Sequence, residues 1–293
     1  MSDIKDNVDQ VTGVETTGHV WDGIAELNNP LPRWWLWIFY ACIAFSLGYV
    51  IYYPAIPLIN ESTKGVSEFS TRANVEKDLQ AVAEANSGLV ARIASTDVAD
   101  IANDSELLRF AIAGGSSAYK VYCSQCHGSG AQGAKAQGYP NLNDDAWLWG
   151  GTIDAIYTTI AHGVRYEQDE DTRVSEMPAF GRDGILTGDE IKALANYVRS
   201  LSSLEHDPEL AASAATLFAD NCAACHGEDG KGIADVGAPN LSDAVWHYGS
   251  EAAQITAQIR NPKHGVMPAW LDRLGDVNVK QLAVYIHSLG GGE

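Results

Sequence analysis

Hydrophobic residues form one unbroken run near the start of the chain. Residues 34–53 read WWLWIFYACIAFSLGYVIYY and contain no charged side chain. A helix needs about 20 residues to cross the hydrocarbon core of a bilayer, and tryptophan and tyrosine gather at both membrane interfaces. The run has Trp34, Trp35 and Trp37 at one end and Tyr49, Tyr52 and Tyr53 at the other. This pattern predicts one transmembrane helix over 34–55.

The residues before this run argue against a cleaved secretory signal. Such a signal begins with a short basic region, whereas residues 1–33 are polar and mostly acidic. We therefore expect the helix to remain as a membrane anchor. Basic residues flank it on both sides, at Arg33, Lys64 and Arg72, so their distribution does not give the orientation.

Downstream, the apolar positions change to a helical period. They recur at i, i+3, i+4 and i+7 in LTGDEIKALANYVRSLS (186–202) and in GDVNVKQLAVYIHSLG (275–290), which predicts two amphipathic helices. Residues 71–113 contain two or three further amphipathic stretches, for which Thr71 and Asp104 are the predicted N-caps. No run with period-two alternation accompanies these segments, so we expect an all-α fold.

The two helical patterns belong to an internal repeat of nearly 100 residues. YPNLNDDAWLWGG (139–151) matches APNLSDAVWHYGS (238–250), and a His-Gly-Val triplet follows each segment. A Met-Pro-Ala-aromatic sequence comes next, directly in the second copy and after an insertion, residues 165–176, in the first. The predicted organisation is an N-terminal segment (1–33), the transmembrane helix (34–55), a helical linker (56–113) and two domains (114–203 and 204–293).

Charge narrows the range of partners. The formal net charge is −19 and the pI is about 4.6, which argues against nucleic acid and favours a basic macromolecule. The insertion contains the acidic run EQDED (167–171). We consider two interpretations of it, a docking site for a basic soluble cytochrome and a solvated loop.

The spacing of the cysteines indicates what kind of site the chain contains. Four of the five cysteines form two C-x-x-C-H motifs, Cys123, Cys126 and His127 and then Cys222, Cys225 and His226, while Cys42 stands alone in the apolar run. This clustering does not suggest a disulfide framework, and C-x-x-C-H is the spacing of c-type haem attachment. A zinc site remains an alternative, with His162 or His264 as the fourth ligand. A thioredoxin-like redox pair requires a βαβ pattern, which is absent from the sequence around both motifs.

The methionines favour haem. Besides Met1, the chain has only Met177 and Met267, at matching places in the two repeats. We predict that their sulfurs are axial ligands opposite His127 and His226; the repeated His162 and His264 are the alternatives and would give bis-histidine haems. Two filled axial positions leave iron no site for oxygen or substrate, so the chain is expected to carry electrons and not to be an enzyme by itself.

Both repeats resemble class I cytochrome c domains, which are wholly helical, over residues 115–203 and 208–290. The resemblance implies two covalently bound haem c groups. It also implies that the carbonyl oxygens of Pro140 and Pro239 accept the N–H of the histidine ligand. The insertion at 165–176 departs from the family pattern, so the resemblance does not describe the loop that leads to Met177.

A second resemblance covers nearly the whole chain. HVWDGIAELNNPLPRWWLWIFY (19–40), one membrane helix and two haem c domains are similar to the di-haem subunit family of cbb3-type cytochrome c oxidases. That resemblance implies a bacterial cytoplasmic membrane, haem domains in the periplasm and residues 1–33 in the cytoplasm.

The same resemblance implies a set of partners. They are a cytochrome c donor, a mono-haem subunit and the haem–copper catalytic subunit of a proton-pumping oxidase. Two alternatives remain open at this stage. One is a free-standing membrane di-haem cytochrome that serves another reductase, and the other is a di-haem peroxidase, in which one iron needs an open position.

Overall fold

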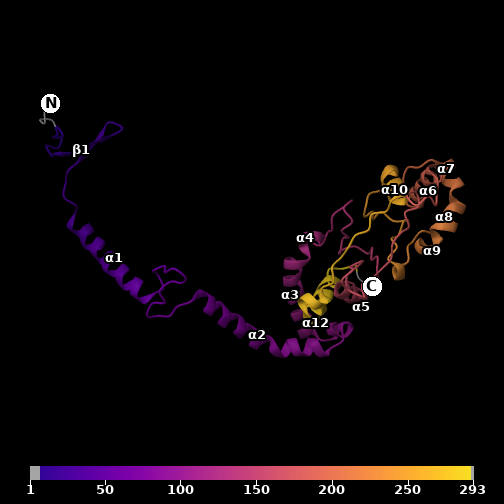
Figure 1. The fold of residues 1–293 in the computed structure, drawn as a ribbon, viewed down its shortest axis with the longest axis horizontal. Coiled ribbons are helices and arrows are strands. Elements are labelled where there is room, and N and C mark those ends of the chain that lie inside the picture. The colour runs from indigo at the N-terminus through magenta and orange to yellow at the C-terminus, as the bar shows by residue number, and fades with distance from the viewer. Residues whose placement is uncertain (1–6, 292–293) are drawn as a thin grey trace. The chain divides into compact units, whose positions relative to one another are not determined.

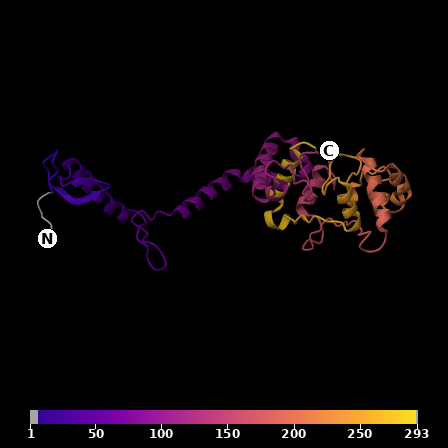
Figure 2. The same ribbon diagram turned by 90° about the horizontal axis from the view of Figure 1, so that it is seen from above.

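The structure, a computed structural model, describes residues 7–291, and the chain divides into two compact units, Met1–Glu84 and Ala85–Glu293. Figures 1 and 2 show the ribbon in two views. Each unit is described by itself below.

The first unit begins with a β-hairpin that the sequence analysis did not predict. Strands β1 (Thr16–Trp21) and β2 (Ile24–Leu27) pair antiparallel, with Trp21 opposite Ile24. Asp22 and Gly23 connect them with φ values of 49° and 84°. Positive φ at both central residues is the signature of a type I′ hairpin turn, for which Asp-Gly is a preferred sequence. This hairpin is the departure from the expected all-α fold.

Helix α1 (Arg33–Tyr52) forms over the apolar run. It follows Pro32 and stops before Pro54, and Tyr53 is extended at φ −102° and ψ 157°. A residue before proline is pushed out of the helical region, which explains the stop before the predicted residue 55. The helix is long and apolar enough to cross a membrane, and none of its residues is buried against the rest of the protein.

Helix α2 (Thr71–Ser95) begins one residue after its cap. The Ser70 hydroxyl accepts a hydrogen bond from the Ala73 N–H at 3.2 Å. Ser70, and not the predicted Thr71, is therefore the N-cap, because Thr71 already lies inside the helix. A 3₁₀ helix, η1 (Val98–Asn103), follows α2.

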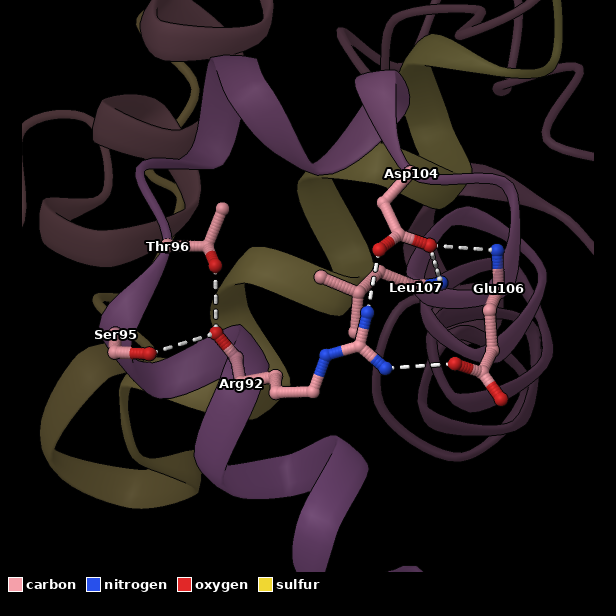
Figure 3. Close-up of polar contacts among 6 residues, drawn as sticks. All are labelled: Arg92, Ser95, Thr96, Asp104, Glu106 and Leu107. Carbon is pink, nitrogen blue, oxygen red and sulfur yellow. Dashed lines mark hydrogen bonds and ion pairs between the residues drawn. The ribbon is translucent and has the colours of Figure 1, made fainter.

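The predicted cap at Asp104 is confirmed. Its carboxylate accepts hydrogen bonds from the Glu106 N–H at 2.9 Å and the Leu107 N–H at 3.2 Å at the start of α3 (Ser105–Tyr122). Figure 3 shows the guanidinium of Arg92, near the end of α2, bonded to Asp104 and, at 2.6 Å, to Glu106. These contacts fix the chain reversal between α2 and α3.

The remaining helices cover the two repeats. They are α4 (Ser124–His127), α5 (Ile153–His162), α6 (Gly188–Leu201), α7 (Pro208–Ser213), α8 (Ala215–Asn221), α9 (Ala223–His226), η2 (Ala234–Val236), α10 (Ala252–Arg260), α11 (Leu271–Leu274) and α12 (Asp276–His287). The two predicted amphipathic helices are α6 and α12. Thr187 and Glu190 form a capping box at the start of α6, which fixes where that helix begins.

Two hydrophobic cores hold this unit together. The first core combines α3 and α5 from the first repeat with α12 from the second, and its buried members include Ile101, Tyr119, Ile160, Leu282 and Val284. The second core combines α8 and α10 from the second repeat with α6 from the first, and its buried members include Leu194, Phe218 and Ile255. Figure 1 shows α12 beside α3 and α5.

The cores therefore do not coincide with the repeats. We predicted that 114–203 and 204–293 each form a domain, but α6 packs with residues of the second range and α12 with residues of the first. The chain crosses over after α5 and returns after α10. At the crossing Val164 and Met267 pair antiparallel, with N–H to carbonyl distances of 2.9 and 3.0 Å in the two directions.

Candidate functional site

Each C-x-x-C-H motif sits on a single helical turn. The backbone N–H groups of Cys126 and His127 donate to the Cys123 carbonyl at 3.1 and 3.0 Å. The second motif repeats this geometry at Cys222, Cys225 and His226 with distances of 3.2 and 2.9 Å. Glycine follows each histidine with a φ of 81° or 77°, a conformation that stops the turn. Two thiols and an imidazole consequently project from one short helix, as predicted.

A proline carbonyl faces each histidine of the motifs. His127 Nδ1 lies 3.1 Å from the Pro140 oxygen, and His226 Nδ1 lies 3.0 Å from the Pro239 oxygen. A carbonyl only accepts, so Nδ1 carries the proton and Nε2 keeps its lone pair for a metal. Burial lowers the pKa of both imidazoles, which favours the neutral form that ligates iron.

Both motifs open into one cavity of about 610 Å³. Its wall is mostly apolar and includes the four cysteines, both histidines and both methionines, Met177 and Met267. Trp147 and Trp246, which occupy matching positions in the repeats, also line it. A large apolar hollow beside paired thiols and a metal-ready imidazole fits a porphyrin.

The zinc alternative fits these residues less well. Among the residues that the structure describes, the side chains that converge closely enough for a metal are His162, Asp169 and Asp171, not the members of the motifs. The donor set of the motifs thus suits covalent haem attachment.

The two alternative histidine ligands differ in their position relative to the cavity, because His264 is among the residues that line it and His162 is not. His162 Nδ1 lies 3.2 Å from each carboxylate oxygen of Asp169 in the insertion. His264 lines the cavity, but its Nε2 accepts the Met177 N–H at 3.1 Å. A nitrogen that accepts this hydrogen bond has no free lone pair for iron.

Arg165 is a site residue that sequence reasoning missed. It belongs to the insertion, lines the cavity and donates to the carbonyls of Gly265 at 2.7 Å and Ser175 at 2.8 Å. Burial lowers its pKa, yet the side chain remains a cation in an apolar wall. A charged residue inside an insertion was the available signal, because the second repeat has no counterpart to it.

The helical repeats and their two attachment motifs define a c-type cytochrome. The N-terminal domain of cytochrome oxidase-cbb3, FixP, matches residues 13–60, and cytochrome C oxidase, cbb3-type, subunit III, matches residues 110–198 and 209–286.

Curated relatives match over nearly the whole chain. The cbb3-type cytochrome c oxidase subunit FixP of Rhizobium meliloti is 54% identical over 100% of both chains. The CcoP subunit of Cereibacter sphaeroides is 52% identical over 95% of each, and that of Azospirillum brasilense 49% identical over 97% of this chain and 98% of its own. The chain belongs to the FixP/CcoP family of cbb3-type cytochrome c oxidase subunits, as the sequence resemblance implied. It is an electron-transfer subunit with c-type haem domains and one apolar N-terminal helix.

Proposed function

We propose that the chain is a di-haem relay of a cbb3-type oxidase. It takes electrons from a cytochrome c donor and passes them through two covalent haem c groups toward a mono-haem subunit and the haem–copper catalytic subunit. The observation that supports this proposal is the single cavity into which both C-x-x-C-H motifs and both methionines project. Two redox groups in one cavity favour transfer between them over separate reactions at each.

The chain's own residues hold and tune the haems. Cys123 and Cys126 bind one porphyrin covalently, Cys222 and Cys225 bind the other, and His127 and His226 ligate the irons. The haem supplies reversible one-electron chemistry when bound. Pro140 and Pro239 orient the imidazoles through the 3.1 and 3.0 Å contacts. Met177 and Met267 would be further ligands of the irons, and thioether ligation would raise the reduction potentials.

This ligation makes the chain a carrier and not a catalyst. If Met177 and Met267 held the irons together with His127 and His226, a bound haem would have no position left for oxygen, peroxide or substrate. Oxygen reduction and proton pumping therefore belong to the other subunits of the oxidase.

Helix α1 sets the location. It spans the bacterial cytoplasmic membrane once, with residues 1–33 in the cytoplasm and the haem domains in the periplasm. The aromatic residues at both helix ends, including Trp37 and Tyr49, are exposed and suit the membrane interfaces. The anchor keeps the relay at the membrane beside its partner subunits.

A haem count of the purified membrane complex tests this function. We expect two covalent haems per chain and a sulfur-to-iron charge-transfer band. Cys126→Ala should remove about half of the haem stain of this subunit, because one thioether link and with it stable attachment are lost. Cys42→Ala, on α1, is the matched control and should keep both haems. A wild-type chain without covalent haem contradicts the proposal.

Two further measurements separate the alternatives. A free-standing cytochrome would not co-purify with a haem–copper oxidase, whereas the proposed subunit should. A di-haem peroxidase would bind carbon monoxide in the reduced state, whereas two six-coordinate haems should not. Carbon monoxide binding by the purified chain would therefore favour the peroxidase.

A further inference from the structure

The segments that lead into the two methionines are hydrogen bonded to each other. These methionine segments are residues 175–177 and 264–267. The Met177 N–H donates to His264 Nε2 at 3.1 Å. Met177 and Met267 both line the cavity, as does His264. The two methionine segments therefore meet in the cavity wall.

Arg165 joins the same two segments through its side chain. Its Nε–H donates to the Gly265 carbonyl oxygen at 2.7 Å, and an Nη1–H donates to the Ser175 carbonyl oxygen at 2.8 Å. Gly265 lies two residues before Met267. Ser175 lies two residues before Met177. One planar guanidinium thus binds equivalent positions of both methionine segments and holds them in a fixed relation.

The backbone around Arg165 is held in place by hydrogen bonds. Its φ is 52°, in the left-handed region that is unfavourable for a residue with a side chain. Such a conformation persists where the surrounding structure imposes it. The Arg165 N–H donates to the Arg173 carbonyl at 2.8 Å, and both the N–H and the carbonyl of the preceding Val164 are bonded to Met267. These bonds fix the point from which the side chain reaches the two segments.

The second repeat has no counterpart to Arg165. This arginine directly follows the His-Gly-Val triplet of the first repeat, whereas Met267 directly follows the matching triplet of the second. The insertion therefore supplies one guanidinium that is shared by both methionine segments.

The charge of Arg165 acts on the same part of the cavity. Both of its acceptors are neutral carbonyls, so the guanidinium remains a net cation in a mostly apolar wall. The carboxylate of Glu176 also lines the cavity but is exposed, so water screens part of its negative charge. A cation near a haem favours the ferrous state, because the ferric state carries one more positive charge.

We infer that Arg165 is a positioning residue shared by the two haem sites. Its guanidinium holds both methionine segments in the arrangement in which Met177 and Met267 face the cavity, and its charge favours the reduced state of both irons. This inference rests on the proposed function, because it requires methionine ligation at two haems. The guanidinium acts on both sites whichever methionine ligates each iron.

Two substitutions of Arg165 separate its geometry from its charge. Arg165→Lys keeps the charge and an aliphatic stem, but a single ammonium nitrogen does not reproduce the planar spread of the two donors. Arg165→Gln removes the charge as well. The full-length chain is purified in detergent with its covalent haems. The sulfur-to-iron charge-transfer band is recorded in the oxidised state, and an optical redox titration gives the two midpoint potentials.

We expect Arg165→Lys to lose more than half of the charge-transfer band, because both sites contribute to that band and both lose their tie. Arg165→Gln should lose at least as much of it. Both midpoint potentials in Arg165→Gln should lie below those of Arg165→Lys, since only the lysine variant keeps the cation.

Three results would overturn the inference. One is a full charge-transfer band in Arg165→Lys, which would exclude a positioning role. Another is the loss of half of the band or less, which would confine that role to one site. The third is a pair of equal potentials in the two variants, which would exclude the effect of the charge.

Arg173→Gln is the matched control within the insertion. The Arg173 side chain donates to the Ala155 carbonyl at 3.3 Å and lies over the Trp149 ring, 5.4 Å from its centroid. Its substitution removes the same charge from the insertion and should keep the full charge-transfer band. A loss equal to that in Arg165→Gln would show a general effect of the insertion and would also overturn the inference.

The haem count separates this inference from the proposed function. An unmodified chain that lacks covalent haem or the charge-transfer band would contradict the proposed function itself. Two haems and a full band in the unmodified chain, with the same band in both Arg165 variants, would overturn the shared positioning role alone. Circular dichroism checks that each variant is folded. If Arg165→Gln is unfolded, the band of Arg165→Lys decides the outcome, because that variant keeps the charge and most of the side chain.

Discussion

Tyr119 carries a buried hydroxyl in the first core. The side chain is 1% exposed, and its hydroxyl donates to the Gly128 carbonyl at 2.7 Å, directly after the first attachment motif. Burial raises the pKa of Tyr119 to about 12, so the hydroxyl remains a donor at every physiological pH. The bond ties the end of the motif to α3.

Removing this hydroxyl should cost stability without disturbing the ring packing. Tyr119→Phe keeps the ring and leaves the Gly128 carbonyl without its donor, which we expect to lower the free energy of unfolding by about 1 kcal/mol. Phe218 already occupies the matching place in the second core, so a phenylalanine fits this environment. Tyr122→Phe, at a 42% exposed tyrosine, is the control. Denaturant unfolding followed by circular dichroism measures both variants, and equal losses would contradict the assignment.

His247, in the wall of the cavity, should make the stability of the protein sensitive to acid. Burial lowers its pKa, and the nearby carboxylates of Asp144 and Asp243 offset only part of that effect. Above the ordinary histidine pKa of about 6.5 both the folded and unfolded forms are neutral. Below it the unfolded chain takes up a proton that the folded chain resists, so stability falls as the pH decreases toward the lowered pKa of the folded state.

We predict that His247→Gln loses less unfolding free energy than the wild-type chain when the pH is lowered. Unfolding free energies are compared at about pH 7.5 and about pH 5.5, on either side of the ordinary histidine pKa. The wild-type chain should lose more stability between them than the variant. His206→Gln, at an exposed position, controls for a general effect of removing a histidine. An unchanged difference in His247→Gln would refute the assignment.

At the scale of elements, the crossing of α3 and α12 depends on a missing side chain. A methyl group at Gly115 would press on the Gln281 backbone and the Tyr285 side chain. We expect Gly115→Ala to lower the free energy of unfolding by about 1–3 kcal/mol, as overpacking usually does. Thermal unfolding of the full chain measures the effect.

Gly88 provides the matched control for that substitution. It lies inside α2, and nothing within 4 Å would meet an added Cβ there. Gly88→Ala should therefore stabilise the helix by about 0.5–1 kcal/mol, the usual advantage of alanine over glycine. Opposite signs for the two substitutions separate the effect at the crossing from general glycine removal. A neutral or stabilising Gly115→Ala would contradict the observed packing.

The sequence predicted the elements better than it predicted their partners. Helical periodicity located α6 and α12, and the capping rule located Asp104 at the start of α3. The hairpin was missed although Asp22-Gly23 between two apolar dipeptides is a hairpin signal. The hairpin lies in a mostly polar segment just before the apolar run. Its strands of six and four residues are too short to show a clear alternation of apolar and polar residues.

The exchange of helices could not be predicted from periodicity. Tyr197 and Tyr285 occupy the same place in their repeats, so either helix matches either core. The loop at 202–207 was the usable signal, because a short connection makes consecutive helices pack as neighbours. In the structure Asp207 and Asn196 are hydrogen bonded across that loop at 2.8 Å. The length of the connection therefore indicates which helices pack together, whereas the alignment of the repeats does not.

At the scale of the whole molecule, the exchange of helices couples the two repeats. Each core needs a helix from both repeats, so neither repeat can unfold while the other keeps its core intact. Unfolding of the haem unit should accordingly be cooperative, in contrast to two domains joined by a linker. A shared cavity and shared cores keep the two C-x-x-C-H motifs in a fixed relation, which suits the proposed relay.

The acidic insertion is the surface on which we expect the donor to dock. Within EQDED, Asp169 is paired with His162. The side chains of Glu167, Glu170 and Asp171 are exposed. A chain of net charge −19 attracts basic proteins, and an exposed acidic loop would direct that attraction.

Neutralising these three side chains tests the docking surface. Glu167→Gln, Glu170→Gln and Asp171→Asn together should slow oxidase turnover with a basic soluble cytochrome severalfold at low salt and flatten its salt dependence, because charge steering acts mainly on association. Glu205→Gln with Glu209→Gln, at exposed acidic positions outside the insertion, is the matched control and should change little. Unchanged turnover and salt dependence in the triple variant would identify the insertion as a solvated loop.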